Sequence, residues 1–204
     1  ACNENRLVEA KSFGSKKQGE IRKVIEFRMA SNGKFLSAPV APAAPALYPQ
    51  IKSIFPDAFV KFTGEYRRCC EIINELTFLI GTLDSQIGID AIAQTEIIQN
   101  ITVNGHNISG ETSNGLLVNI KVVTTKFFYH QLFMQTGSED HVKAVLERIT
   151  DSINEPENEE LIYRKAGLAW IPPELREGDT FIEKAANNTL PHLITYQYLK
   201  GTLH

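Results

Sequence analysis

Residues 64–81 read GEYRRCCEIINELTFLIG, and this stretch decides the fold that the sequence predicts. Its first part is expected to form a short helix that carries Arg67 and Arg68, followed by a turn near Asn74. Residues 75–80 predict a strand whose side chains alternate between two faces. The apolar face holds Leu76, Phe78 and Ile80, and the other face holds Glu75, Thr77 and Leu79. One face would therefore meet a hydrophobic core, while the other presents two polar side chains.

A second segment predicts two further strands of the same sheet. Residues 107–112 and 116–123 are joined through Asn114-Gly115, a dipeptide that favours tight turns between antiparallel strands. In the second arm, Asn119 and Lys121 fall on the row of side chains opposite to the apolar row. The other elements expected here are a strand over residues 58–63, a helix that begins near Ala46 because Pro49 belongs in a first turn, and a helix over residues 89–98.

Helical segments are expected on both sides of this sheet. Near the N-terminus, residues 3–11 and 16–29 predict two helices separated by a turn at Phe13-Gly14-Ser15. After the sheet, helices are expected over residues 126–135, 139–150 and 159–163. His141 is expected to be an ordinary surface or half-buried histidine. A solvated acidic face is expected to consist of Glu155, Glu157, Glu159 and Glu160.

The order of these segments resembles that of the DNA polymerase X family. In that family a Gly-Ser-x-Arg-Arg helix precedes a Gly-Asp-x-Asp strand, as residues 64–68 precede residues 74–77 here. Residues 115–123, GLLVNIKVV, resemble the strand that supplies the family's third metal-binding aspartate. Residues 136–141, TGSEDH, resemble the segment that shapes its nucleotide pocket. The most specific match is GLAWIPPELR at residues 167–176, which is close to a signature of bacterial members.

The resemblance implies an α+β fold, with a nucleotidyltransferase-type palm that contains a mixed β-sheet. Residues 1–38 would be the end of a helix-hairpin-helix domain, residues 39–125 the palm and residues 126–200 a helical thumb. Residues 201–204, Gly-Thr-Leu-His, resemble the start of a polymerase and histidinol phosphatase (PHP) domain, a metal-dependent phosphoesterase. On this interpretation the chain is a fragment, and His204 would be the first metal ligand of the truncated domain.

The family's three metal-binding aspartates fall on Glu75, Thr77 and Asn119 in this chain. Nucleotidyl transfer in the family uses two Mg²⁺ ions about 3.5–4 Å apart, which need several carboxylate ligands, and these three side chains supply one. The family's nucleotide-binding positions, in degenerate form, are Gly64, Glu65, Arg67, Thr136 and Gly137. A carboxylate at position 65 would repel a triphosphate. We therefore expect no intact catalytic site, and neither a metal nor another cofactor in this fragment.

Basic residues near the N-terminus make that segment the one best suited to DNA. Residues 1–30 carry seven Lys and Arg against four Glu, although the net charge of the whole chain is −3. By the resemblance, Gly14, Lys16 and Lys17 would hold a DNA phosphate as a helix-hairpin-helix does. A plain turn between two helices, with solvated lysines, is the alternative on sequence alone.

Together these features predict a DNA-binding, polymerase X-like part of a DNA repair protein that lacks polymerase activity. Its expected partners are DNA, bound weakly and without sequence preference, and a PHP domain in cis. One alternative is an active DNA-directed DNA polymerase or nucleotidyltransferase that uses Glu75 and a substitute ligand. Another is a structural or protein-interaction domain that supports a PHP phosphoesterase. The sequence has no apolar run of about 18 residues and no signal pattern, which predicts a cytoplasmic protein with no membrane partner.

Overall fold

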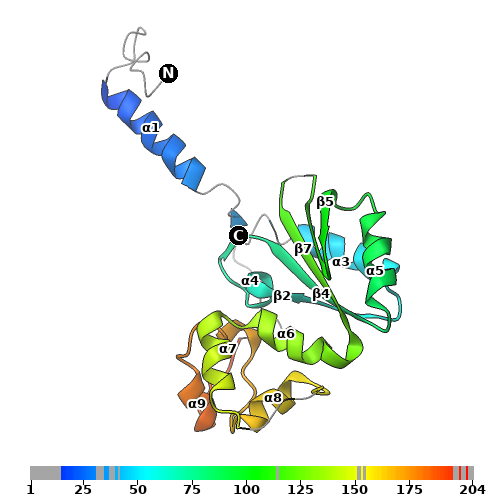
Figure 1. Cartoon of the computed structure of the whole chain (residues 1–204). Coiled ribbons are helices and arrows are strands. Elements are labelled where there is room, and N and C mark those ends of the chain that lie inside the picture. The colour runs from blue at the N-terminus through cyan, green and yellow to red at the C-terminus, as the bar shows by residue number, and fades with distance from the viewer. Residues whose placement is uncertain are drawn as a thin grey trace.

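The computed structural model describes residues 15–30, 35–36, 40, 42–113, 115–150, 153, 155–194, 198 and 201. Within these residues the chain is a mixed α+β protein built on a five-stranded sheet, with a group of short helices beneath it in Figure 1. None of the helices in the described ranges is long and apolar enough to cross a membrane. The five-stranded sheet and the helices confirm the general α+β prediction.

The central sheet mixes parallel and antiparallel pairs, as predicted. Its strand order is β2-β4-β7-β6-β5, and the neighbours β4 and β7 run parallel while the other pairs are antiparallel. The strands are β2 (Phe59–Thr63), β4 (Leu76–Thr82), β5 (Gln99–Asn104), β6 (Asn107–Glu111) and β7 (Leu117–Thr124). Since β4 and β7 lie side by side, two segments more than 30 residues apart in sequence come together at the centre of the sheet (Figure 1).

Helices α3 (Ala43–Ile54) and α5 (Ser85–Ala93) pack on one face of the sheet. The core on this side includes Phe78 of β4 and Ile120 of β7, which are register partners with almost no exposed surface. Burial of a side chain of this size contributes about 1.5–3 kcal/mol to the free energy of folding. Because side chains alternate along a strand, the residues next to Phe78 in β4 and next to Ile120 in β7 point to the opposite face of the sheet.

That opposite face is covered at one end by α6 (Phe128–Thr136), which follows a short 3₁₀ turn (Thr125–Phe127). Phe128 and Leu132 of α6 pack against Leu79 of β4. Phe133, on the other side of α6, belongs to a separate core made by the C-terminal helices. Helix α6 therefore joins the core of the C-terminal helices to this face of the sheet.

We call residues 128–186 the helical unit, and residues 43–124 the sheet unit. The helical unit contains α6, α7 (Glu139–Leu146), α8 (Glu159–Lys165), a 3₁₀ turn (Pro173–Leu175) and α9 (Ile182–Ala186). Ser138 caps α7 by accepting a hydrogen bond from the His141 amide. The N-terminal helix α1 (Ser15–Ala30) lies apart from both units in Figure 1.

Two expected helices have other bounds in the structure, and two further features were not expected. Helix α3 begins at Ala43, so Pro49 lies inside it; the buried side chains of Leu47 and Ile51 hold the helix in place despite the missing N–H. The helix expected over residues 89–98 is α5, which begins earlier, at Ser85, and ends at Ala93. Residues 99–104 form a strand, β5, that the sequence interpretation missed. A two-stranded sheet of β1 (Phe35–Leu36) and β3 (Ile72–Ile73) was also not expected.

His141 of α7 is fully buried in the helical unit, so the expectation of a surface or half-buried histidine is wrong. Its Nε2 lies 2.9 Å from the Tyr163 hydroxyl oxygen, and its Nδ1 lies 3.3 Å from the Gly178 carbonyl oxygen. A carbonyl only accepts hydrogen bonds, so Nδ1 donates and Nε2 accepts from Tyr163. Burial lowers the pKa of His141 to about 4, and the positive charge of Arg176 acts in the same direction.

The neutral state of His141 predicts that acid weakens the fold. The unfolded chain protonates the imidazole near pH 6.5, whereas the folded chain keeps it neutral down to about pH 4, so stability falls as the pH drops through this window. The loss is at most about 3.5 kcal/mol, because one pKa unit corresponds to about 1.4 kcal/mol. Urea unfolding at a series of pH values would measure it. A His141→Gln variant should flatten the dependence, and an unchanged slope would contradict this origin.

Candidate functional site

The three positions predicted to match metal-binding aspartates meet at one place on the open face of the sheet. Thr77 of β4 is the register partner of Asn119 of β7, and Glu75 immediately precedes β4. The Asn119 side-chain amide donates a hydrogen bond to the Glu75 carboxylate. The parallel pairing of β4 with β7 therefore brings together, from two separate segments, the positions that the resemblance singled out.

These side chains line an open cleft of about 380 Å³. Gly64, the first residue of α4 (Gly64–Arg67), closes one side of it with a positive φ of 61°. A Cβ atom on Gly64 would lie 2.6 Å from the Thr77 hydroxyl oxygen, so only glycine allows this close approach. We call this the β4–β7 cleft; its lining includes Thr63, Gly64, Glu75, Thr77, Asn119 and Gln135.

Glu75 is the one carboxylate among the residues that line the cleft, and its surroundings make the charged form less favourable than it is in water. Partial burial raises the pKa of Glu75 above its ordinary value, and the negative charge of Glu65 adds to this shift. The hydrogen bond from Asn119 opposes the shift, because it stabilises the charged form. The cleft therefore holds its negative charge less readily than a solvent-exposed glutamate would.

The donor set of this cleft does not fit a pair of magnesium ions. Mg²⁺ takes an octahedral shell of hard oxygen ligands, and two such ions held close together need several carboxylates. Here there is one carboxylate, and the neighbouring amide already donates to it. Among the residues that the structure describes, no group of three or more His, Cys, Asp or Glu side chains is placed to hold a metal ion.

The carboxylate of Glu65 is bonded to the neighbouring residue Asn74. Its two carboxylate oxygens accept hydrogen bonds from the backbone and side-chain nitrogens of Asn74, each at 2.6 Å. These bonds connect α4 to the residue before Glu75 and fix the turn between helix and strand. Glu65 therefore has a local structural role, and its charge acts on the cleft only through its effect on Glu75.

The predicted nucleotide-binding residues Arg67, Thr136 and Gly137 also meet, but at the junction of the two units. Arg67 Nη1 donates to the Thr136 hydroxyl oxygen at 2.6 Å, and Gly137 follows directly as the C-terminal cap of α6. Both terminal nitrogens of Arg67 are also bonded to Glu159 of α8, at 3.1 and 2.5 Å. Arg67 is thus bound within the protein itself.

Glu159 is the residue that sequence reasoning most clearly misplaced. It was expected on a solvated acidic face, but its side chain is only 7% exposed and lies between Arg67 and Arg176. Arg176 is fully buried and donates to Glu159 at 2.5 Å. Desolvation alone would raise the pKa of Glu159, but the hydrogen bonds and charges of the two arginines outweigh it and lower that pKa. We call these three residues the ionic triad.

A second arginine of the same segment makes a parallel link at the surface. Arg68 Nε donates to the Glu177 carboxylate at 2.6 Å, and its Nη1 donates to the Thr136 carbonyl oxygen at 2.8 Å. Glu177 is 64% exposed, so this pair contributes little to stability compared with the buried triad. Both arginines that follow Gly64 therefore contact the helical unit.

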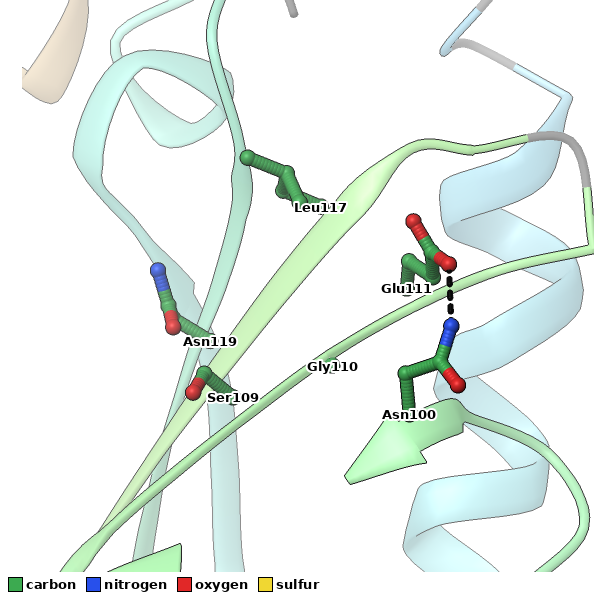
Figure 2. Close-up of a pocket in the computed structure, with 6 residues that line it drawn as sticks. All are labelled: Asn100, Ser109, Gly110, Glu111, Leu117 and Asn119. Carbon is green, nitrogen blue, oxygen red and sulfur yellow. Dashed lines mark hydrogen bonds between the residues drawn. The ribbon is translucent and has the colours of Figure 1, made fainter. Parts of the chain in front are cut away.

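Figure 2 shows a second hollow on the same face of the sheet, of about 290 Å³, which sequence analysis did not foresee. Asn100 Nδ2 donates to the Glu111 carboxylate at 2.5 Å across its rim. Ser109 pairs with Asn119 in the sheet, and Asn119 lines both this hollow and the β4–β7 cleft. The two depressions are therefore neighbours on one polar surface.

The predicted DNA-binding residues are described only in part. Lys16 and Lys17 are exposed in the first turn of α1, whereas Gly14 lies outside the described residues, as does the preceding helix of the predicted hairpin. His204, the predicted metal ligand of a further domain, also lies outside them. These assignments remain predictions.

No family model matches the chain, and no curated protein matches its sequence.

The close approach of Gly64 to Thr77 predicts a specific sensitivity to alanine. Gly64→Ala should destabilise the protein by about 2–4 kcal/mol, the sum of a strained positive φ and a displaced Thr77. Gly105→Ala is the matched control: Gly105 has a φ of 57° but open space around it, so it should cost only about 1–2 kcal/mol. Equal losses in chemical denaturation would show that the contact with Thr77 carries no strain.

Proposed function

We propose that this chain is a polymerase X-like, DNA-binding module of a DNA repair protein that lacks polymerase activity. On this proposal the sheet unit is a nucleotidyltransferase-type palm, the helical unit is a thumb, and α1 belongs to a helix-hairpin-helix. DNA would be bound weakly and without sequence preference. The support comes from the ordered sequence motifs together with the mixed sheet that carries them.

One observation carries the proposal: Glu75, Thr77 and Asn119 converge on one open face, and only one of them is a carboxylate. A chance alignment of short motifs has no reason to bring residues from two segments into register on neighbouring strands. The convergence therefore supports the resemblance, while the residue types argue against catalysis. A cleft whose lining has one carboxylate cannot balance two dications and a triphosphate.

Primer extension tests the loss of activity. With a primed template, all four deoxynucleoside triphosphates and either Mg²⁺ or Mn²⁺, the chain should incorporate no nucleotide, because its cleft lacks the charge to hold the metal pair. An active polymerase of the same family serves as the positive control. Incorporation that disappears in a Glu75→Gln variant would overturn the proposal in favour of an active nucleotidyltransferase.

Restoring carboxylates tests whether their loss is the reason. A variant with both Thr77→Asp and Asn119→Asp would carry three carboxylates in the β4–β7 cleft, so it should bind Mn²⁺ at least about tenfold more tightly than the unmodified chain. Electron paramagnetic resonance of free Mn²⁺ would measure this. Ser109→Asp, on the neighbouring hollow, is the matched control and should change the affinity little. No gain in the double variant would mean that these positions do not form the metal site.

The main competing function is a structural or protein-interaction domain that supports a phosphoesterase. The binding of Arg67 and Arg68 within the protein favours it, because neither arginine is then positioned to contact a phosphate. Under this alternative the chain would show no DNA affinity, or an affinity that does not fall with salt. Phosphate contacts impose a steep salt dependence, so the two functions can be distinguished.

Replacing two lysines of α1 tests the DNA contact. Lys16→Ala with Lys17→Ala should weaken binding to unrelated DNA sequences by roughly tenfold at moderate salt and make the salt dependence shallower, since phosphate contacts are lost. Fluorescence anisotropy at several salt concentrations would measure both effects. Lys143→Ala with Lys184→Ala, exposed on α7 and α9, is the control of equal charge. Equal weakening by both pairs would remove the special role of α1.

A further inference from the structure

The ionic triad has the composition of an anion-binding site. Two guanidinium groups, from Arg67 and Arg176, face one carboxylate, that of Glu159. Oε1 of Glu159 accepts from Arg67 at 3.1 Å and from Arg176 at 2.5 Å, and Oε2 accepts from Arg67 at 2.5 Å. The cations outnumber the anion, and charge-assisted bonds of this kind are the strong ones.

Both guanidinium groups are also held by atoms other than Glu159. Arg67 donates to the Thr136 hydroxyl oxygen at 2.6 Å, and that hydroxyl donates to the Leu132 carbonyl oxygen at 2.6 Å. Arg176 Nε donates to the Ile171 carbonyl oxygen at 2.8 Å, and its guanidinium carbon lies 5.0 Å from the centre of the Tyr163 ring. The two cations are therefore positioned by the surrounding protein, which is what a pre-organised anion site requires.

The donors of this site exceed its acceptors. Arg176 has no exposed surface, and its Nη2 is buried without a hydrogen-bond partner among the described residues. The Trp170 ring lies 5.7 Å from the same guanidinium, and this contact is weaker than a hydrogen bond to an anion. A buried cation with a spare donor strongly favours retention of a negative charge beside it.

The three residues of the ionic triad come from both units of the molecule. Arg67 belongs to α4 of the sheet unit, whereas Glu159 and Arg176 belong to the helical unit, and Arg67 and Glu159 are 92 positions apart in sequence. We propose that Arg67 and Arg176 form an anion-binding site whose resident ligand is Glu159 of the same chain, and that this internal carboxylate latches the helical unit onto the sheet unit. The latch does not depend on the proposed function.

An external anion could take this place only when the internal one is removed. The site is nearly closed, with Arg67 18% exposed and Glu159 7% exposed, so its occupant must be small. Formate is a small planar carboxylate, so its two oxygens can accept hydrogen bonds from the two guanidinium groups as the two oxygens of Glu159 do. Chloride offers one centre without that geometry, which makes it a suitable reference anion.

The experiment is chemical rescue of a Glu159→Ala variant. Its thermal midpoint should fall by roughly 10 °C in chloride, because two buried cations lose their counter-charge. Sodium formate at the same ionic strength should restore at least half of this loss and return the fluorescence of Trp170, the single tryptophan of the chain, toward that of the unmodified protein. Glu183→Ala, which removes the exposed partner of Arg148, is the control and should not respond to formate.

Two outcomes would overturn the proposal. If formate stabilises Glu159→Ala no more than chloride does, no anion site exists there. A second variant, Arg67→Gln, covers the case in which Glu159→Ala does not fold, since it leaves the Glu159–Arg176 pair intact. Hydrogen exchange at residues 64–68 should become at least tenfold faster in Arg67→Gln while that of α8 stays unchanged. Unchanged exchange at residues 64–68 would show that the contact does not latch the units.

Discussion

The ionic triad of Arg67, Glu159 and Arg176 is the interaction on which the arrangement of the two units depends. Each unit has its own hydrophobic core, and α6 contributes Phe133 to that of the helical unit while its Phe128 and Leu132 pack against Leu79 on the opposite face of the sheet. Apolar contacts along one helix resist separation but tolerate sliding, because they have no direction. The triad adds directional bonds at a fixed point, and removing one member leaves a buried charge without compensation. The cores therefore supply most of the stability, while the triad fixes the geometry.

Apolar packing and polar side chains also have separate roles in the β4–β7 cleft. Alternation along β4 and β7 sends Phe78 and Ile120 into the core and leaves Thr77 and Asn119 on the open face. The register is fixed by the buried face, since a slip of one residue would exchange the two sets. The positions of the cleft residues thus follow from apolar packing on the other side of the sheet. The residue types at those positions then decide which chemical groups the cleft offers to a ligand.

Much of this arrangement was predictable from sequence, and the failures have physical reasons. The alternation in residues 75–80 and 116–123 predicted β4, β7 and the side chains they expose. Strand β5 was missed because its side chains are almost all exposed and give no apolar period; Asn104-Gly105, a favoured turn before β6, was the available signal. Glu159 was misjudged because nearby acids in sequence suggested a solvated face, while its partners lie 92 and 17 residues away.

The cleft and the triad are mechanically connected through α4. A helix of one turn has no stability of its own, so α4 must be held by its contacts. Arg67 attaches its C-terminal end to Glu159, Glu65 attaches its middle to Asn74, and Gly64 abuts Thr77 at its start. A shift of the helical unit would pull Arg67 and would be transmitted to the wall of the cleft. The shape of the cleft is therefore set by the helical unit as well as by the sheet, and the contacts of Arg67 and Arg68 with the helical unit transmit that influence.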